Sequence, residues 1–267
     1  DKGFVPDSSN DVTIPAAASV PFLDQNRSVK SLFISQPTAQ MILDGFFLTV
    51  SSQLVNSGIL DMTGSRLTLG GNWNNSGVLL STGSELVFNS GSSAQYVDNH
   101  GAAFGLVVSS NTDKGLYFVS SMTASTLLVN TRDMVQSATI YFAGGSTFTI
   151  GNLSLTGALG TNIVLRSTNA ASVWYLNNTS THAVNYSQVT MSSASAGQLI
   201  VAYNSVDLGN NTNWSFPLSF VDTGFRYWIG TSNSQWNLDA NWSTSSGGVA
   251  SGGAPISSHT VVFDGAG

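Results

Sequence analysis

A stretch of this chain occurs twice, 19 residues apart. Residues 56–69 and residues 75–88 are identical at eight of fourteen positions, and the matches include apolar residues as well as the turn residues Asn, Ser, Gly and Thr. A repeat of about twenty residues is too short for a pair of helices. It is typical of one coil of a β-solenoid, in which each coil pairs its strands with those of the next coil.

The matching positions also predict the register of these two coils. A shift of one residue would turn every side chain to the other face of the sheet, so the register is strongly specified. Amide side chains that share one turn position can hydrogen-bond from coil to coil. The pairs that we predict to stack and point inward are Ile59 with Val78 and Leu67 with Leu86, and the pair predicted at one turn is Asn56 with Asn75.

The composition favours strands and turns over helices. Charged residues make up 8% of the chain and there is a single Glu, so the long helix formers of a helical surface are missing. With 42% hydrophobic residues in a length of 267, the chain can bury a sizeable core. Short apolar runs alternate with Gly, Asn, Ser and Thr clusters. The runs predicted as strands are Ser31–Ile34, Met41–Leu43, Phe46–Val50, Arg66–Leu69, Glu85–Phe88, Leu106–Val108, Leu116–Val119, Thr126–Val129, Thr139–Phe142, Thr147–Ile150, Asn162–Leu165, Val173–Leu176 and Gln198–Tyr203.

The end of the chain resembles its beginning at a much longer spacing. At an offset of 249 residues, six of fifteen positions are identical, and the matched prolines each precede an alternating apolar run. We interpret this as one period of a tandem array followed by a short overlap, so the predicted neighbour of this unit is another copy of itself. The identical pairs are Gly3 and Gly252, Pro6 and Pro255, Ser8 and Ser257, Ser9 and Ser258, Val12 and Val261, and Ala17 and Ala266, while Ile14 corresponds to Phe263.

Three segments follow from these patterns. Residues 1–28 are predicted to be a strand segment equivalent to the start of a repeat, residues 29–216 the β-solenoid, and residues 217–267 a Trp-rich junction module that leads into the next repeat. We expect the aromatic residues of the module to cover the open end of the solenoid, whose last coil would otherwise expose strand edges and apolar core. Whether successive units are one polypeptide or separate subunits stays open.

Three segments carry motifs that are found in other proteins. The first comprises Tyr227-Trp228-Ile229-Gly230, Trp236, Ala240-Asn241-Trp242-Ser243, Pro255 and Val261-Val262-Phe263-Asp264. It resembles the segment repeated between modules of very large secreted bacterial β-helix proteins. Residues 69–77 are similar to rungs of autotransporter-like and filamentous-haemagglutinin-like passengers, and residues 209–216 resemble the ends of such β-helical units. The resemblance implies a right-handed parallel β-helix in a giant extracellular or cell-surface adhesin or filament protein, with no catalytic residues.

Charge and hydropathy limit the partners. The net charge is −6, and the eight Lys and Arg residues form no basic patch, so nucleic acid is not an expected partner. No apolar stretch approaches the roughly 18 residues of a membrane helix, so we expect no membrane insertion. The chain begins without Met or a signal-like segment, and we expect it to be processed or cut from a longer chain.

The residues that carry chemistry form no catalytic or metal-binding pattern. The chain has no Cys, and His100, His182 and His259 are scattered, so we expect neither a metal ion nor a cofactor. Asp98 beside His100 is the one close pair, which we interpret as a turn between coils. Cleavage of an acidic polysaccharide would need carboxylates gathered on one face, and no catalytic residue is nominated. The carboxylates considered for that role are Glu85, Asp98, Asp113 and Asp133, which are spread along the chain.

We therefore expect a non-enzymatic structural unit of an extracellular filament, stalk or adhesin that associates end to end with neighbouring copies. The alternative is a carbohydrate-binding or polysaccharide-cleaving β-helix domain, whose Trp side chains would contact surface polysaccharide. Trp73 and Trp174, which lie among the coils, are expected to be packing residues. The residues expected at the junction, or in contact with sugar, are Trp214, Trp228, Trp236, Trp242, Pro255, Val261, Phe263, Pro6, Val12 and Ile14.

Overall fold

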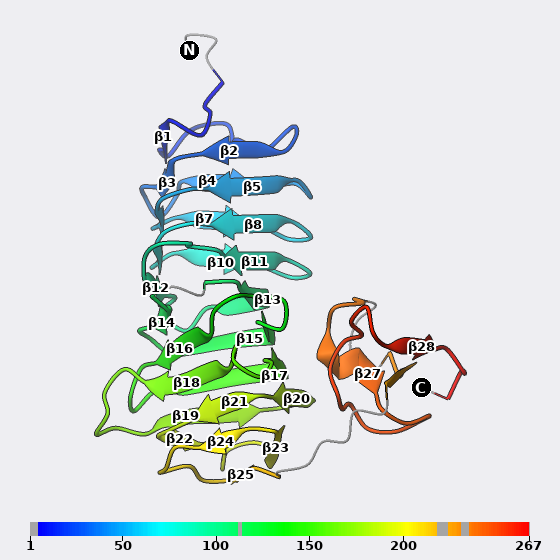
Figure 1. Cartoon of the computed structure of the whole chain (residues 1–267). Helices are drawn as coiled ribbons and strands as arrows, with labels where there is room; N and C mark the ends of the chain where they lie inside the picture. The colour runs from blue at the N-terminus through cyan, green and yellow to red at the C-terminus, as the bar shows by residue number, and fades with distance from the viewer. Residues whose placement is uncertain (1–4, 112–113, 218–223, 231–234, 267) are drawn as a thin grey trace. The chain divides into compact units, whose positions relative to one another are not determined.

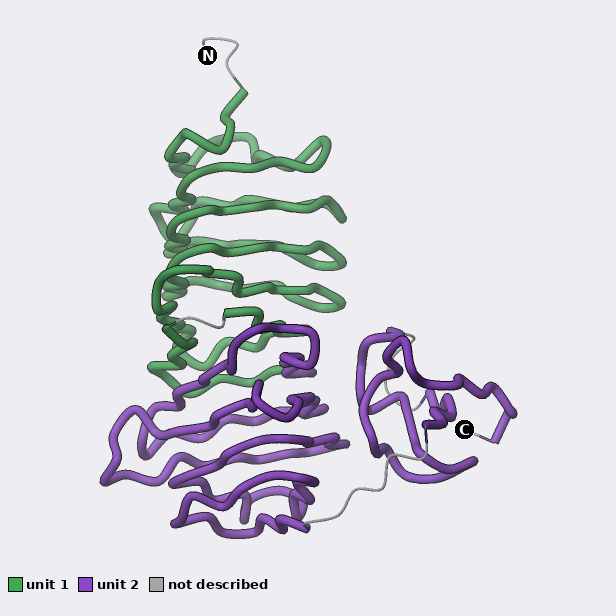
Figure 2. The backbone as a smooth tube through the Cα atoms, viewed as in Figure 1, with its two compact units in different colours: residues 1–125 green, residues 126–267 purple. Residues whose placement is uncertain are grey.

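The computed structural model has an all-β fold (Figure 1). Parallel strands are stacked as a β-solenoid of about nine turns, and a small separate sheet follows, which confirms the predicted fold class. The chain divides into two compact units, residues 1–125 and residues 126–267 (Figure 2). Gly3 and Asp113 lie outside the described residues. The described residues are 5–111, 114–217, 224–230 and 235–266.

Unit 1 consists of short strands that return to the same sheet after each coil. They are β1 Asp11–Ile14, β2 Arg27–Val29, β3 Ser31–Ile34, β4 Gln40–Ile42, β5 Phe47–Val50, β6 Leu54–Asn56, β7 Ile59–Asp61, β8 Arg66–Leu69, β9 Trp73–Asn75, β10 Val78–Leu80, β11 Glu85–Phe88, β12 Gln95–Asp98, β13 Ala103–Ser109 and β14 Leu116–Phe118. Within this unit the sheet orders are β1-β3-β6-β9-β12-β14, β2-β5-β8-β11-β13 and β4-β7-β10. Completing a turn brings each strand beside its parallel partner, so no crossover helix is needed.

The two copies of the 19-residue repeat form successive coils in the predicted register. Ile59 lies opposite Val78 in a parallel pair, and Leu67 lies opposite Leu86. Leu67 and Leu86 are buried as predicted, but Val78 is 52% exposed, so the prediction of an inward Ile59–Val78 pair was wrong. Leu60 takes the inward position of β7 instead, because successive side chains of a strand point to opposite faces.

Unit 2 continues with longer and less regular strands. They are β15 Met122–Asn130, which begins in unit 1, β16 Ala138–Phe142, β17 Thr147–Thr156, β18 Ile163–Ser167, β19 Trp174–Asn178, β20 His182–Asn185, β21 Ser187–Val189, β22 Ser192–Ser193, β23 Ile200–Tyr203, β24 Val206–Asp207 and β25 Trp214–Ser215. The sheet orders within the unit are β16-β18-β21-β24 and β17-β20-β23-β25. β17 is long enough to pair with β19 along its first half and with β20 along its second.

A small module follows the coils of unit 2. It contains β26 Phe225–Trp228, the 3₁₀ turn η1 Asp239–Asn241, β27 Trp242–Ser243 and β28 Thr260–Val262. β26 is the central strand, antiparallel to β27 and parallel to β28. We call residues 224–230 and 235–266 the aromatic module.

Candidate functional site

Three of the four Trp residues predicted for the junction, Trp228, Trp236 and Trp242, gather into one cluster in the aromatic module, whereas Trp214 lies in β25. Trp228 and Trp236 each lie edge-on to Trp242, with ring centroids 5.0 and 4.8 Å away. Phe263 joins them, with its ring centroid 6.1–6.2 Å from each of the three indole rings. Edge-to-face packing of this kind places the positive rim of one ring against the negative face of the next, which stabilises the cluster beyond the area it buries.

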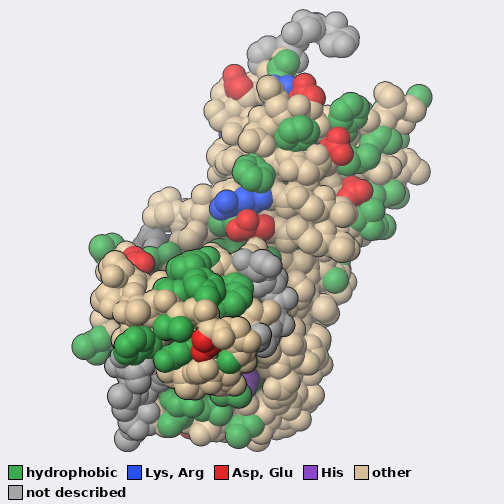
Figure 3. Space-filling model, turned by 90° about the vertical axis from the view of Figure 1, so that its right-hand side faces the viewer, with side chains coloured by type: hydrophobic (Ala, Val, Ile, Leu, Met, Phe, Trp, Pro, Cys, Tyr) green, Lys and Arg blue, Asp and Glu red, His purple; other side chains and the backbone are tan. Residues whose placement is uncertain are grey.

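One side of this aromatic cluster is closed and the other is open. Trp242 is fully buried, and its indole N–H donates a hydrogen bond to the carbonyl oxygen of Trp236 at 2.6 Å. Trp236 is 52% exposed and Phe263 is 65% exposed. Figure 3 shows hydrophobic side chains gathered on the surface of the module, while most of the visible surface is neither hydrophobic nor charged. Exposed apolar groups gathered in this way mark a binding surface.

Two arginines hold the segment that leads into β28. Arg226 is fully buried; its Nε donates to the carbonyl oxygen of Gly253 at 3.0 Å and its Nη2 to that of Gly252 at 2.8 Å. Arg132, from the coils, donates from Nη1 to the carbonyl oxygen of Ala254 at 2.8 Å. Because hydrogen bonds from charged groups are stronger than neutral ones, these bonds fix residues 252–254 firmly.

Asp239 completes this polar centre. Its Oδ1 accepts a hydrogen bond from the backbone N–H of Ala254 at 2.6 Å, and its own N–H donates to Ser154 Oγ at 3.2 Å. Burial raises the pKa of the Asp239 carboxyl to about 6, although the Ala254 N–H, Arg132, Ser154 and Arg226 act in the opposite direction. The module therefore encloses a carboxylate together with positive charge, and removing one partner would leave the other uncompensated.

The aromatic module lies against the side of the coils in unit 2. The main contacts of η1 are with β17 and β20, and the hydrogen bond from Asp239 to Ser154 joins η1 to β17. This differs from the expectation that the module covers the open end of its own solenoid, where β25 is the last strand. After that strand, Trp214 stacks on Phe216 with ring centroids 6.0 Å apart. The polar centre explains this position, because Asp239 of η1 and Arg132 of the coils both bind residues 252–254 there.

The first and last segments of the chain share one local conformation. In each, the matched proline is followed by a turn and then by a strand that begins at an equivalent residue, Asp11 in β1 and Thr260 in β28. The turn at the beginning has a hydrogen bond from Asn10 N–H to the carbonyl oxygen of Asp7 at 3.0 Å. The equivalent bond at the end joins His259 and Ile256 at 2.9 Å.

A side chain closes both turns in the same way. The backbone N–H of Asp7 donates to Asn10 Oδ1 at 2.9 Å, and the backbone N–H of Ile256 donates to His259 Nδ1 at 3.2 Å. An amide oxygen and an imidazole nitrogen thus act as the same acceptor at positions 249 residues apart. The two segments therefore share the same turn and the same first strand residue after Pro6 and Pro255.

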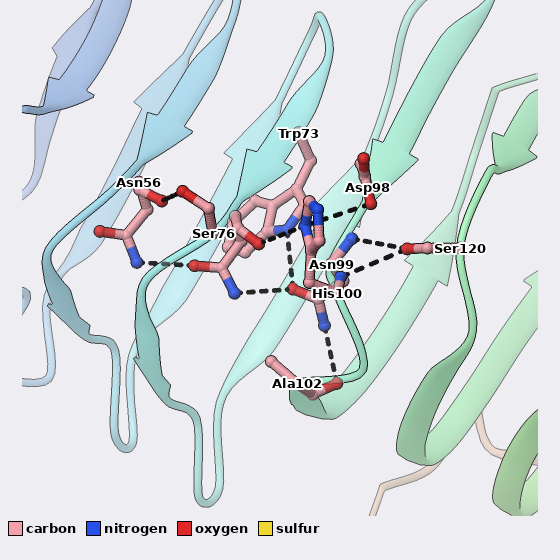
Figure 4. A network of polar contacts seen from close by, with 9 residues as sticks. Asn56, Trp73, Ser76, Asp98, Asn99, His100, Ala102 and Ser120 are labelled. Carbon is pink, nitrogen blue, oxygen red and sulfur yellow. Dashed lines mark hydrogen bonds and ion pairs between the residues drawn. The ribbon is translucent and has the colours of Figure 1, made fainter.

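A ladder of asparagines links the coils of unit 1 (Figure 4). Asn56 Nδ2 donates to Asn75 Oδ1 at 2.7 Å, which confirms the predicted turn pair. Asn75 Nδ2 in turn donates to Asn99 Oδ1 at 3.1 Å, and that oxygen also accepts from Trp73 Nε1 at 3.0 Å. Asn99 was not predicted because its coil is longer than 19 residues, although Asn99-His100-Gly101 repeats the Asn-x-Gly pattern of the two earlier turns.

Two of the histidines have structural contacts, His100 at a turn and His182 in a partly buried position of β20. His100 has φ of 46° and lies with Nδ1 3.3 Å from Asp98 Oδ1, at a turn between β12 and β13, as interpreted from the sequence. His182 accepts the Val201 N–H at Nε2, and burial lowers the pKa of its imidazole. Within the described ranges, no three His, Asp or Glu side chains gather in a way that could hold a metal ion.

The carboxylates considered for catalysis occupy separate places. Glu85 pairs with Arg66 at 3.5 Å, and Asp133 is exposed. Trp73 and Trp174 are buried in the coils; Trp174 stacks on Phe142 with ring centroids 4.1 Å apart. The roles of Asp239, Arg226 and Arg132 were not predicted, since isolated charged residues in a polar chain form no pattern that indicates burial.

Comparison with protein-family models, with curated proteins and with solved structures finds no match for this chain. Among the described residues, no helix has the length and apolar character needed to cross a membrane.

Proposed function

We propose that this chain is a structural repeat unit of an extracellular filament, stalk or adhesin, and that it associates end to end with copies of itself. The observation that carries the proposal is the equivalence of the two chain ends, in which the same turn and the same strand recur 249 residues apart. A unit whose last segment repeats its first is suited to propagation along one axis, because each copy supplies the beginning of the next.

The character of the unit supports this role. Stacked coils can transmit force through rows of parallel backbone hydrogen bonds and through the asparagine ladder. The few charges are dispersed along the chain, and pairs such as Arg66–Glu85 lie on the outside of the coils. A surface with few charges and many uncharged Ser, Thr and Asn side chains suits a chain that stays extended outside the cell.

Polypeptides with one, two and three copies at the 249-residue period would test the proposal. If neighbours dock, the maximum dimension in small-angle scattering rises by one constant increment per copy, and the midpoint of thermal unfolding rises from one copy to two. Copies that tumble independently and unfold at one unchanged midpoint would contradict it.

A second candidate is carbohydrate binding at the aromatic module, with surface polysaccharide as the partner. The observation that favours it is Trp236, which is half exposed beside Trp242 and Phe263 and offers a ring face to a sugar. Binding to a panel of neutral and acidic polysaccharides, lost in Trp236→Ala but retained in Trp214→Ala, would support this candidate. Equal binding by both variants would count against it.

A further inference from the structure

Within the described part of unit 1, the first coil has a strand edge that pairs with no second strand and, beside it, an apolar hollow. β1 pairs only with β3 among the described strands, so one of its edges is open. Beside it lies a cavity of about 400 Å³ whose walls include Val12, Leu32 and Leu48, with Phe22 at its rim 63% exposed. Open strand edges and exposed apolar surface invite association, and natural proteins cover them.

The hydrogen bonds of β1 identify its open edge. The carbonyl oxygens of Asn10 and Ile14 accept from the backbone N–H groups of Lys30 and Ser35, so the peptide groups of residues 10, 12 and 14 face β3. Peptide groups alternate in direction along a strand, and those of Asp11 and Thr13 therefore face away from β3.

The equivalent edge of β28 is already filled. Thr260, which corresponds to Asp11, donates its N–H to the carbonyl oxygen of Gly224 at 2.8 Å, and β26 pairs with β28 in parallel on that side. Thus β26 lies on the side of β28 that corresponds to the open side of β1. The pairing within the aromatic module provides a template for what binds β1.

We propose that the open edge of β1 binds β26 of a preceding copy of this chain. By the register of β26 on β28, Arg226 of the preceding copy would lie opposite Val12 and Tyr227 opposite Thr13. This inference rests on the proposed function, and it names the edge, the partner strand and the register of the junction.

The aromatic cluster of the preceding copy would then cover the hollow. Val12 and Leu32 point to the interior of the first coil. In the observed pairing of β26 with β28, Val261 lies at the position that corresponds to Val12. The next side chain of β28 on the same face is Phe263, which contacts Trp228 and Trp242. Ile14 would occupy the place of Phe263 against these rings. The module of one copy thereby covers the first coil of the next copy and not the last coil of its own.

The template also shows what occupies the edge of β26 in a single copy. β28 of the same chain pairs with that edge, while β1 and β28 each pair with one strand only among the described strands. In an array, the β1 of each following copy replaces β28. Whether that β1 is joined by a peptide bond or belongs to a separate chain, the bonds made are the same.

Disulfide cross-linking tests the register, since the chain has no native Cys. In a two-copy polypeptide in which Val249 is followed by the second copy, we combine Tyr227→Cys in the first copy with Thr13→Cys in the second. Adjacent strands lie about 4.8 Å apart, within the range of Cα separations that a disulfide spans. The matched control replaces Thr13→Cys by Val12→Cys, which points to the other face, and we expect at least about tenfold less disulfide there.

A second measurement uses separate full chains. A Tyr227→Cys chain is mixed with a Thr13→Cys chain, with and without Thr260→Pro in the first, because this substitution removes the N–H that holds β28 to Gly224. We expect the cross-linked dimer to increase several-fold with Thr260→Pro.

The outcomes separate this inference from the proposed function. Equal cross-linking at residues 12 and 13, or none at residue 13 in protein with an unchanged circular dichroism spectrum, overturns the inference. If tandem copies lengthen and stabilise one another without this cross-link, the filament role stands and the junction lies elsewhere. If the cross-link forms but the copies do not form an extended array, the junction stands and the filament role fails.

Discussion

The coils of unit 1 and the aromatic module of unit 2 are both built from short strands, but different interactions hold them. In the coils, equivalent residues of successive turns stack on one another, as Leu67 does on Leu86, and polar side chains such as Asn75 bond to their counterparts. In the module, no residue stacks on a counterpart. A buried Trp242 and the polar centre of Arg226 and Asp239 hold three short strands that would be marginal alone.

This difference between repeated and unrepeated contacts predicts which substitutions destabilise each region most. A repeated contact is shared among neighbours, and a change harms a coil most when it prevents one turn from lying on the next. A module with one aromatic cluster and one polar centre has no second copy of either. Substitutions in the module are therefore expected to lower the free energy of unfolding more than equally conservative substitutions in the coils.

The largest effect is expected for Trp242→Ala. The ring is fully buried, and its removal should lower the free energy of unfolding by about 3–5 kcal/mol, measured by urea denaturation. Exposure of the cluster should also cause aggregation on gel filtration or weaken assembly. The matched control is Trp236→Ala, which removes a half-exposed ring of the same cluster and should cost clearly less. An equal cost would show that the cluster is not organised around Trp242.

The next effect concerns pH and Asp239. Burial raises the pKa of the Asp239 carboxyl from its ordinary value of 3.8 to about 6 in the folded protein. The folded state is therefore most stable, with respect to this group, below the ordinary pKa, and it loses this stability as the pH rises through about 6. The shift corresponds to about 3 kcal/mol between pH 3 and pH 7. In Asp239→Asn this part of the pH dependence should vanish, as measured by chemical denaturation at a series of pH values.

A control of opposite sign lies in the same module. Asp264 is exposed, and hydrogen bonds from Ser246 and Ala266 lower the pKa of its carboxyl, so its contribution is lost as the pH falls. The wild-type protein should lose a little free energy of unfolding as the carboxyl of Asp264 becomes protonated at acid pH, and Asp264→Asn should not show this loss. A pH profile that changes in the same direction in both variants would contradict the assigned burial of Asp239.

In the coils, the largest effect is expected for Gly77→Ala. A Cβ at this position would overlap the carbonyl oxygen of Gly58 in the preceding coil, and backbone cannot move aside as a side chain can. We expect a loss of about 3 kcal/mol in the free energy of unfolding. Gly83→Ala is the control: Gly83 has φ of 65° but its nearest contact would be 3.9 Å away, so only the backbone strain of about 1–2 kcal/mol applies. Equal losses would argue against close stacking at Gly77.

The smallest effect is expected for Asn75→Ala in the asparagine ladder. The substitution removes the bonds to Asn56 and Asn99, and at about 1 kcal/mol for each bond the loss should be about 2 kcal/mol. Asn74→Ala, at an exposed position of the same strand, should change the free energy of unfolding little. If the two variants unfold at the same urea concentration, the ladder does not stabilise the coils.

Much of the coil structure could be predicted because its contacts lie close in the sequence. The strands Ser31–Ile34, Arg66–Leu69 and Glu85–Phe88 have the bounds expected from their apolar alternation. Strands such as β9 and β20 were missed, since their inward positions include buried Asn75 and Asn185 in place of aliphatic residues. Hydrogen bonds with Asn56 and Asn99 compensate the burial of the Asn75 amide, and a binary pattern of apolar and polar residues does not reveal them.

By itself the sequence determined the parallel solenoid, the register of its 19-residue coils, the Asn56–Asn75 pair and the correspondence of the two chain ends, because each is expressed as the same residue types recurring at a constant offset. Only the tertiary structure decided that Leu60 replaces Ile59 inside the coil and that the aromatic module lies against β17 and β20. It also decided that Arg132 binds the carbonyl oxygen of Ala254, 122 residues away. Such contacts depend on how the chain folds back in space, and no local pattern of apolar and polar residues records them.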